Sequence, residues 1–361
     1  MPVAHRIANL REKLAQEGLE ALVVSDGLNR RYLSGFTGSA GHLILSQSAA
    51  LFATDSRYYE QVGQQAPDYQ LERVGYEFIE NLTRMLGQAG ARRVGFEANS
   101  LTVANYADWV EKTPGIEWVA TRGLVEGLRV VKEAEEIETM RAAVRLTDEA
   151  FAHVCQFIRP GMTEVQVAWE IEKFFRERGA VGWPAGHIVA GGPHGALPHA
   201  RPTDRVLERG EPIVIDMGCI LDGYYSDMTR TIILGHADAR FEEVYSVVLQ
   251  AHQAAEDIAR ADLSSQVVDN TGRGVIEAAG YGEFFGHGLG HGVGLNIHEA
   301  PAARKTKGEP LLAGMTLTIE PGVYLPEWGG VRVEDLTVIE QDRAVPLTQS
   351  PKQLSDMVIP V

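Results

Sequence analysis

The chain has 361 residues, 45% of them hydrophobic, which is enough apolar material for two folded domains. Its formal net charge is −16 and no basic stripe interrupts the acidic balance, so we expect no nucleic-acid partner. The sequence contains no apolar run of about 18 residues and no apolar core of a signal peptide, and its two cysteines offer no disulfide framework. We therefore expect a soluble, cytoplasmic protein with no membrane partner.

Residues 1–127 alternate between helical and strand patterns, which predicts a small α/β domain. The expected elements are a helix with Ile7, Leu10 and Leu14 on one face, strands over 21–24, 42–45 and 50–54, a helix over 82–89, a strand over 93–96, and a helix over 101–111 capped by Ser100. None of these segments carries residues at metal-ligand spacing. We therefore expect residues 1–127 to form a non-catalytic N-terminal domain.

The second predicted domain, residues 128–361, begins with a long amphipathic helix from Lys132 that ends at the sequence RPG, residues 159–161. Thr163 and Gln166 then form a capping box that opens the next helix. The following elements are strands over 188–190, 212–217 and 224–234, helices over 241–260 and 267–279, and strands over 315–324 and 330–340. Two helices followed by a strand hairpin occur twice, which predicts an α+β domain of duplicated helix-helix-hairpin units.

The first predicted hairpin places two aspartates in apolar surroundings, in the sequence PIVIDMGCILDGYYSDMTRTIIL. Asp216 interrupts the outgoing strand, and Asp227 lies on the returning strand beyond an Asp222-Gly223 turn. Because the midpoint of the two aspartates falls at that turn, their carboxylates should lie opposite or diagonal across the ladder, roughly 5–8 Å apart. Two such carboxylates repel each other in a low dielectric, and a bound cation removes that repulsion.

The second predicted hairpin repeats this pattern with glutamates. Glu320 ends the apolar strand in TLTIEPGVYL, and Glu334 lies within the returning strand in GGVRVEDLTVI. Four carboxylates with a histidine suit hard or borderline ions such as Mn²⁺, Co²⁺ or Zn²⁺, and their charge neutralises two dications. Two metal ions about 3.5–4 Å apart are typical of a hydrolytic centre.

Three histidines crowd into GHGLGHGVGLNIHE, residues 286–299. One of His287, His291 and His298 is expected to complete the metal shell, and the glycines beside His291 allow its backbone to approach closely. The other two histidines remain available for substrate binding and proton transfer. His199, in GALPHARPTD, is by composition as readily a loop histidine as a site residue. Taken singly, each of these groups would more often be structural, but their joint occurrence on two hairpins favours a metal site.

Together these motifs resemble the pita-bread metallopeptidases, and most closely the bacterial Xaa-Pro peptidases of the aminopeptidase P and prolidase type. The resemblance covers most of the chain, because YLSGFTGSAG and DSRYYEQ look like the N-terminal domain of creatinases and prolidases. It implies two divalent metal ions per chain, with manganese expected first and cobalt or zinc as alternatives. The implied ligands are Asp216, Asp227, His291, Glu320 and Glu334.

The resemblance also implies roles in hydrolysis. Glu320 would help to move the proton of the attacking water, and His298 would stabilise the oxyanion that forms at the scissile carbonyl. His287 and His199 would line the site, and Arg332 would pair with a ligand carboxylate. The implied enzyme is a dinuclear metallo-exopeptidase, and proteins of this kind are usually homodimers.

The residues after His298 bear on substrate length. Strict prolidases resemble HE-x-P-R, whose arginine receives the carboxylate of a dipeptide, whereas here Ala302 stands at that place and Arg304 follows it. We therefore expect aminopeptidase P-like cleavage of the N-terminal Xaa-Pro bond in peptides with a free N-terminus. Xaa-Pro dipeptidase activity is the alternative.

Three other assignments fit the sequence less well. Methionine aminopeptidases ordinarily lack an N-terminal domain of this length, and creatine amidinohydrolase has lost the metal ligands. A non-catalytic peptide-binding relative would also lack at least one ligand, whereas all five are present here.

Overall fold

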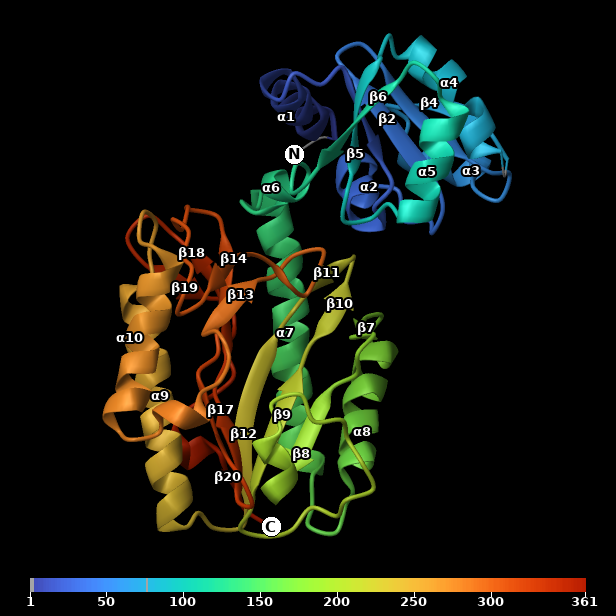
Figure 1. Ribbon diagram of the computed structural model, residues 1–361. Helices are drawn as coiled ribbons and strands as arrows, with labels where there is room; N and C mark the ends of the chain where they lie inside the picture. The colour runs from blue at the N-terminus through green and yellow to red at the C-terminus, as the bar shows by residue number, and fades with distance from the viewer. Residues whose placement is uncertain (1–2, 76) are drawn as a thin grey trace. The chain divides into compact units, whose positions relative to one another are not determined.

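The computed structural model describes residues 3–75 and 77–361 and contains two compact units, Met1–Arg129 and Val130–Val361 (Figure 1). Each unit has an apolar core of its own. Within the described residues, no helix combines the length and the apolar character that crossing a membrane requires.

The first unit is built on a sheet whose six strands, in the described part of the chain, follow the order β4-β3-β2-β1-β5-β6. The strands are β1 Ala21–Val24, β2 His42–Ser46, β3 Ala50–Thr54, β4 Gln70–Arg73, β5 Arg93–Glu97 and β6 Glu117–Thr121. The helices are α1 Val3–Gln16, α2 Gly27–Ser34, α3 Tyr59–Gln65, α4 Phe78–Gln88, α5 Val103–Lys112 and α6 Glu126–Arg129. β1 is antiparallel to β2 and parallel to β5. This mixed sheet with helices confirms the expected α/β class.

The apolar core of this unit lies between the sheet and helices α4 and α5. Ala21 and Val23 of β1 belong to the same buried cluster as Leu82 of α4 and Trp109 of α5. Successive residues of a strand point to opposite faces, and Leu22, on the other face, is also fully buried. A strand buried on both faces reads as a continuous apolar run, which is why β1 is predicted at its observed bounds.

The sequence pattern misses β4 and β6, which are the two edge strands of this sheet. Many of their side chains are exposed, so the apolar alternation that marks a half-buried strand is weak. The helix expected over 101–111 begins at Val103, because Thr102 Oγ1 accepts a hydrogen bond from Asn105 N at 3.2 Å. The assignment of Ser100 as its cap is therefore wrong.

The second unit places its strands between two pairs of helices (Figure 1). The helices are α7 Ala134–Phe157, α8 Glu164–Glu177, α9 Ala239–Ile258 and α10 Ser265–Ala278. The capping box of Thr163 and Gln166 at the start of α8 is confirmed. Apolar residues from all four helices, including Phe175 of α8 and Tyr245 of α9, pack with the strands into one continuous core.

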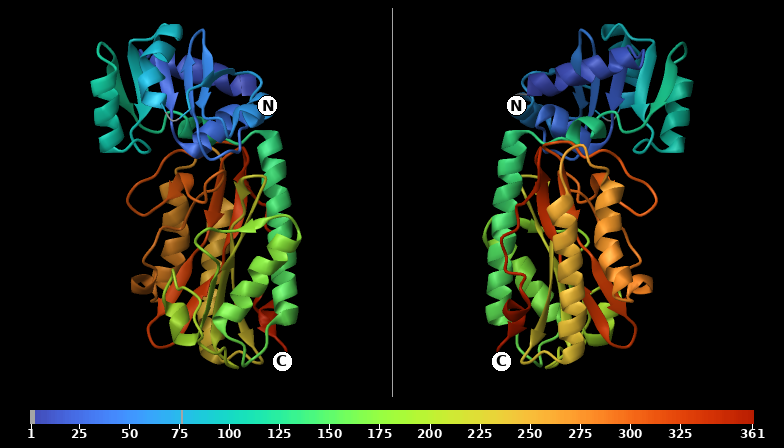
Figure 2. Two further views of the ribbon diagram at one scale, coloured as in Figure 1. Left: turned by 90° about the vertical axis from the view of Figure 1, so that its right-hand side faces the viewer. Right: turned by 90° about the vertical axis from the view of Figure 1, so that its left-hand side faces the viewer.

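Several small sheets make up the centre of this unit. Within the described residues, they have the orders β20-β12-β9-β8, β11-β10-β7, β13-β14, β15-β18-β19 and β16-β17. The strands are β7 Val181–Gly182, β8 Ile188–Gly191, β9 Pro212–Met217, β10 Cys219–Leu221, β11 Tyr224–Tyr225, β12 Met228–Leu234, β13 Gly290–Gly292, β14 Glu299–Ala303, β15 Thr316–Ile319, β16 Gly322–Leu325, β17 Gly329–Arg332, β18 Asp335–Ile339, β19 Ala344–Pro346 and β20 Val358–Ile359. In the left-hand side view α8 lies in front of these strands and α7 runs along one edge, and in the right-hand view α9 lies in front (Figure 2). The repeated order of two helices and a strand hairpin agrees with the predicted duplication.

The hairpin strands are interrupted, and three of the four acids lie at the interruptions. The strand expected over 224–234 is divided into β11 and β12, with Asp227 between them. Glu320 separates β15 from β16, and Glu334 separates β17 from β18. Of the four acids, Asp216 alone lies inside a strand, so the prediction of Glu334 within an unbroken strand is wrong.

The interruptions arise because the backbone changes its hydrogen-bonding partner at these points. Glu320 N donates to Leu289 O at 2.8 Å, and Glu334 N donates to Thr229 O at 3.0 Å. Thr229 belongs to β12, in a different sheet from β17, and Leu289 immediately precedes β13, in a different sheet from β15. Pro321 follows Glu320 and has no N–H group with which to continue the ladder. The acids therefore lie where the sheets of this unit meet.

Candidate metal centre

The two aspartates occupy neighbouring positions of the first hairpin. Asp216 in β9 is directly opposite Thr229 in β12, and Asp227 precedes Thr229 by two residues. Asp227 immediately precedes β12, and the charge of Asp216 is close enough to contribute to the raised pKa of Asp227. This register agrees with the relationship expected from the sequence.

His291 joins the acids from β13. Its Nε2 atom lies 3.6 Å from Asp227 Oδ2 and 3.4 Å from Glu320 Oε1. Its Nδ1 lies 3.0 Å from Gly292 O, and a proton donated there leaves the Nε2 lone pair directed at the carboxylates. Burial lowers the pKa of His291 to about 4, so the ring is neutral at pH 7, as a metal ligand requires.

Glycine beside His291 allows this close approach. A Cβ atom at Gly290 would lie 1.8 Å from Thr318 O, so β13 can sit against β15 only without a side chain there. His291 N donates to Thr318 Oγ1 at 2.9 Å, which fixes the backbone of the histidine. The glycine-rich sequence is thus explained by close packing of strands at the centre.

The acids themselves are electrostatically unfavourable neighbours. Burial, followed by repulsion from Glu334, raises the pKa of both Asp227 and Glu320 well above their usual values. Burial and repulsion from Asp216 raise the pKa of Glu334 to about 8. Each raised pKa indicates that the surrounding protein groups do not offset the cost of a buried negative charge at this position.

The donor set fits divalent metal ions. Ligand atoms of Asp227, His291 and Glu334 lie within 4.8 Å of one another, and Glu320 is adjacent through His291. Among the described residues, Asp216 Oδ1 is a buried oxygen that has no hydrogen-bond partner. Oxygen-rich ligation with one imidazole is the coordination that Mn²⁺, Co²⁺ and Zn²⁺ accept. A cation would satisfy the buried oxygen and lower the repulsion among the acids.

Arg332 and Thr229 support the acids from behind. Arg332 Nη2 donates to Asp216 Oδ2 at 2.6 Å, and its Nε donates to Thr229 Oγ1 at 3.0 Å. Thr229 Oγ1 in turn donates to Glu334 Oε2 at 2.6 Å. This chain of bonds connects one acid of each hairpin and orients both carboxylates. Thr229 was not predicted, although its place opposite Asp216 was readable from the hairpin register.

Two further histidines lie beside the acids. The ring of His298 is 4.4 Å from that of His291, in an edge-to-face arrangement. His287 Nε2 is 3.0 Å from Tyr324 OH, and Arg332 Nη1 donates to the same hydroxyl at 2.8 Å. His287 Nδ1 lies 2.7 Å from Gly288 O and donates its proton to that carbonyl, so its Nε2 accepts a hydrogen bond from the Tyr324 hydroxyl. Tyr324 is a second residue that the sequence did not indicate.

His199 is exposed on the loop after the 3₁₀ helix Gly192–Ala196. Burial and the nearby His199 lower the pKa of His298, and His199 also contributes to the lower pKa of His287. The predicted site residues therefore occupy one region of the second unit. What each of them does in the reaction stays a prediction.

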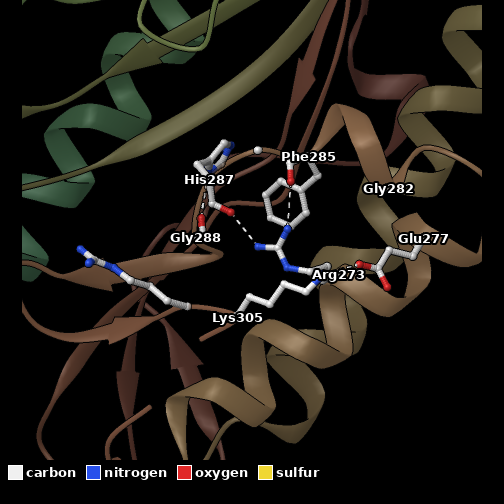
Figure 3. Close-up of a pocket in the computed structure, with 9 residues that line it drawn as sticks. Arg273, Glu277, Gly282, Phe285, His287, Gly288 and Lys305 are labelled. Carbon is white, nitrogen blue, oxygen red and sulfur yellow. Dashed lines mark hydrogen bonds and ion pairs between the residues drawn. The ribbon is translucent and has the colours of Figure 1, made fainter. Parts of the chain in front are cut away.

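A pocket of about 310 Å³ adjoins His287 (Figure 3). Arg273, Phe285, Arg304 and Lys305 contribute to its lining. Arg273 is neutralised by Asp269, and Lys305 by Glu277. Arg304 is exposed and has no acidic partner among the described residues, so it gives the pocket a net positive character.

In a second group of histidine and acidic residues, the negative charge is neutralised by cationic side chains of the protein. His252, Glu256 and Asp335 approach one another behind the centre. Arg230 Nη2 and Lys352 Nζ donate to Asp335 at 2.7 and 2.5 Å, so the negative charge is already neutralised. We interpret this group as a buried ion-pair network that supports the neighbouring Glu334.

Comparison with protein families identifies the kind of enzyme that carries these ligands. Residues 138–341 match the model of metallopeptidase family M24, and residues 6–131 match the creatinase/prolidase N-terminal domain. The chain belongs to metallopeptidase family M24. Its membership implies divalent metal ions, in agreement with the donor set of the second unit.

This M24 peptidase is similar along its whole length to proteins named for Xaa-Pro bonds. The Xaa-Pro dipeptidase of Pyrococcus furiosus is 31% identical over 354 residues, which cover 97% of this chain and 99% of that protein. The solved Xaa-Pro dipeptidase of Bacillus anthracis is 36% identical, with a TM-score of 0.95 over 99% of this chain and 100% of that one. The X-Pro aminopeptidase of Thermotoga maritima is 33% identical, with a TM-score of 0.89 over 97% and 100% of the two chains.

Proposed function

We propose that this M24 peptidase is a dinuclear metallo-exopeptidase that hydrolyses the Xaa-Pro bond at the N-terminus of peptides. The observation that carries the proposal is the convergence of four carboxylates and a neutral histidine at the junction of the two hairpins. The relatives named for Xaa-Pro bonds, which the chain matches from end to end, support the substrate class.

The proposed ligands are Asp216, Asp227, His291, Glu320 and Glu334. Two divalent ions, manganese first and cobalt or zinc as alternatives, would polarise a carbonyl and lower the pKa of a water molecule. The chain supplies the remaining chemistry. Glu320, whose Oε1 lies 3.4 Å from His291 Nε2, is assigned to hold the proton released by the attacking water.

The histidines are assigned to binding the substrate, and Arg332 is assigned to orienting Asp216. His298 donates to the oxygen of the scissile carbonyl, where negative charge develops. His287, which is fixed by Tyr324, and the exposed His199 are assigned to line the site beside His298. Arg332 holds Asp216 through its 2.6 Å bond and does not contact the substrate in this proposal.

Peptides longer than dipeptides are the proposed substrates, and the pocket beside His287 supports this choice. β14 ends at Ala303, and Ala302 is the cross-strand partner of His291. Arg304 follows two residues later, roughly 6–7 Å farther along an extended chain. A carboxylate held there belongs to a peptide that extends beyond the residue next to the cleaved bond. The names of several relatives favour the dipeptide alternative, so it remains the second candidate.

Hydrolysis of two substrates tests the proposal. The metal-free protein, supplied with Mn²⁺, is assayed with an Xaa-Pro dipeptide and with the same sequence extended by one alanine. We expect cleavage of the Xaa-Pro bond in both, with a higher kcat/KM for the tripeptide. A higher value for the dipeptide would support the dipeptidase alternative, and no cleavage of either would contradict the proposed function.

We further propose that the first unit is non-catalytic and that the protein is a cytoplasmic homodimer. The unpaired cysteines, Cys155 and Cys219, support a reducing compartment. Sedimentation equilibrium of the metal-loaded protein measures the dimer directly, and a single species at the mass of one 39.5 kDa chain would contradict it.

A further inference from the structure

The first hairpin is broken on both strands at the same level. β9 ends at Met217 and β10 begins at Cys219, while β11 ends at Tyr225 and β12 begins at Met228. The gap contains Gly218 on one strand and Ser226 with Asp227 on the other. Asp227 therefore lies within the gap and Asp216 lies two residues before Gly218, and the backbone hydrogen bond from Ser226 N to Cys219 O at 2.9 Å spans the gap.

The side chain of Trp183 fills this break. Its indole Nε1 donates to Ser226 O at 3.1 Å, which is the carbonyl of the peptide group leading into Asp227. The ring lies against Gly218, because a Cβ atom there would be 2.5 Å from Cζ2 and 2.7 Å from Cε2 of the indole. Trp183 thus contacts both strands of the break.

Ser226 is also held from the opposite side. Its hydroxyl lies 2.7 Å from Thr147 Oγ1 of α7 and accepts a hydrogen bond from Cys219 N at 2.9 Å. Its side chain and its carbonyl are therefore fixed by separate partners. Removing the indole N–H frees the carbonyl, while the serine hydroxyl keeps its bonds.

The segment that carries Trp183 is anchored at both ends on the strands of this hairpin. Before it, Gly182 pairs with Cys219, and after it, Ile188 pairs with Asp216. The buried His187 lies with its Nε2 3.4 Å from Glu172 Oε2, so the segment packs beside α8. The indole consequently has a fixed position relative to Asp216 and Asp227.

We propose that Trp183 is a positioning residue of the metal centre. Its indole N–H and ring hold the break in the first hairpin so that both aspartates direct their carboxylates to one point. This role rests on the metal centre of the proposed function, and it predicts that Trp183 acts on metal affinity without contacting the metal or the substrate.

Trp183→Phe tests this role, because it keeps an aromatic ring against Gly218 and removes the hydrogen bond to Ser226 O. Trp169→Phe is the matched control, since Trp169 of α8 is 64% exposed. Calorimetric titration of Mn²⁺ into EDTA-treated protein measures affinity, and thermal unfolding of the same metal-free samples measures stability. The absorption spectrum of Co²⁺-loaded protein reports on ligand geometry independently of activity.

We expect Trp183→Phe to weaken the binding of at least one Mn²⁺ ion about tenfold and to alter the Co²⁺ spectrum. Trp169→Phe should match the wild type in both. The metal-free Tm of Trp183→Phe should be lower than that of Trp169→Phe by no more than about 2 °C, the effect of one lost hydrogen bond. Wild-type affinity in Trp183→Phe would overturn the positioning role, as would a loss of affinity explained by a larger fall in the metal-free Tm. A wild-type protein that binds no divalent ion would overturn the proposed function, and this role with it.

Discussion

Asp216 and Thr229 face each other across the β9–β12 ladder, and the hydroxyl of Thr229 reaches Glu334, a residue of the other hairpin, at 2.6 Å. One threonine thus links acids that are more than 100 residues apart in the sequence. Its hydroxyl also accepts from Arg332, so its single proton is committed to Glu334.

Thr229→Val should therefore impair catalysis more than stability. Valine preserves the shape of the side chain but leaves Glu334 without its hydrogen bond, and we expect kcat/KM to fall about 10- to 100-fold. Thr337→Val is the control, because Thr337 is buried and donates to Leu317 O at 2.8 Å in the same hairpin region. Each substitution removes one buried hydrogen bond, worth about 1 kcal/mol. Equal loss of kcat/KM in both variants would contradict a specific role for Thr229.

Asp227→Asn should abolish activity and leave the fold intact. The amide removes one ligand charge, so we expect activity to fall at least about 100-fold and Mn²⁺ binding to weaken. The metal-free protein should become more stable, because burial and Glu334 already disfavour the Asp227 carboxylate. Thermal unfolding after EDTA treatment measures this gain, with the exposed Asp342→Asn as control. Full activity of Asp227→Asn would exclude Asp227 from the metal centre.

The metal-free protein should lose stability as the pH rises. Glu334 has a pKa of about 8 in the folded protein, against an ordinary value of 4.5. The folded state therefore binds more protons across this interval, so the contribution of Glu334 is full below pH 4.5 and disappears as the pH passes 8. The pKa values of His287 and His291 are lowered to about 4, so their contributions to the stability of the folded protein change only at lower pH.

Thermal unfolding at about pH 7 and about pH 8.5 checks this sign. EDTA-treated protein should show a Tm lower by a few degrees at the higher pH, whereas Mn²⁺-loaded protein should change less. A metal-free Tm that rises over this interval would contradict the raised pKa of the acids.

Arg304→Gln should reduce the preference for a free peptide carboxylate. We expect wild-type protein to cleave an Xaa-Pro-Ala tripeptide about fivefold faster, in kcat/KM, than its C-terminal amide, because an exposed ion pair contributes about 1 kcal/mol. In Arg304→Gln this ratio should approach one. Lys307→Gln removes the same charge from a neighbouring exposed position outside the pocket and should keep the wild-type ratio. An unchanged ratio in Arg304→Gln would remove the pocket from substrate binding.

The sequence was most informative where burial is deep and periodic. β1 is predicted at its observed bounds because it is a continuous apolar run, and β9 because Asp216 alone interrupts its apolar run. The helix α7 is recognised because its buried positions recur at helical spacing. The edge strands β4 and β6 were missed because their side chains are largely exposed.

The residues of the candidate site could be predicted from the sequence for a different reason. An acid such as Asp216 within an apolar run, or a glycine such as Gly290 beside a histidine, departs from what packing alone requires. The residues that orient the acids produce no comparable irregularity in the sequence pattern. Thr229 and Tyr324 are ordinary in a strand, and their roles depend on contacts between strands that are far apart in the sequence. The interruptions at Glu320 and Glu334 likewise depend on hydrogen bonds to other sheets.

Those interruptions have a mechanical consequence. The proposed ligands lie at the junctions between separate small sheets. Bound ions would therefore cross-link these sheets. Removal of the ions by chelation should then weaken all of these junctions together. Amide hydrogen exchange should become faster next to Asp227, Glu320 and Glu334, whereas the interiors of α7 and α9 should keep their protection.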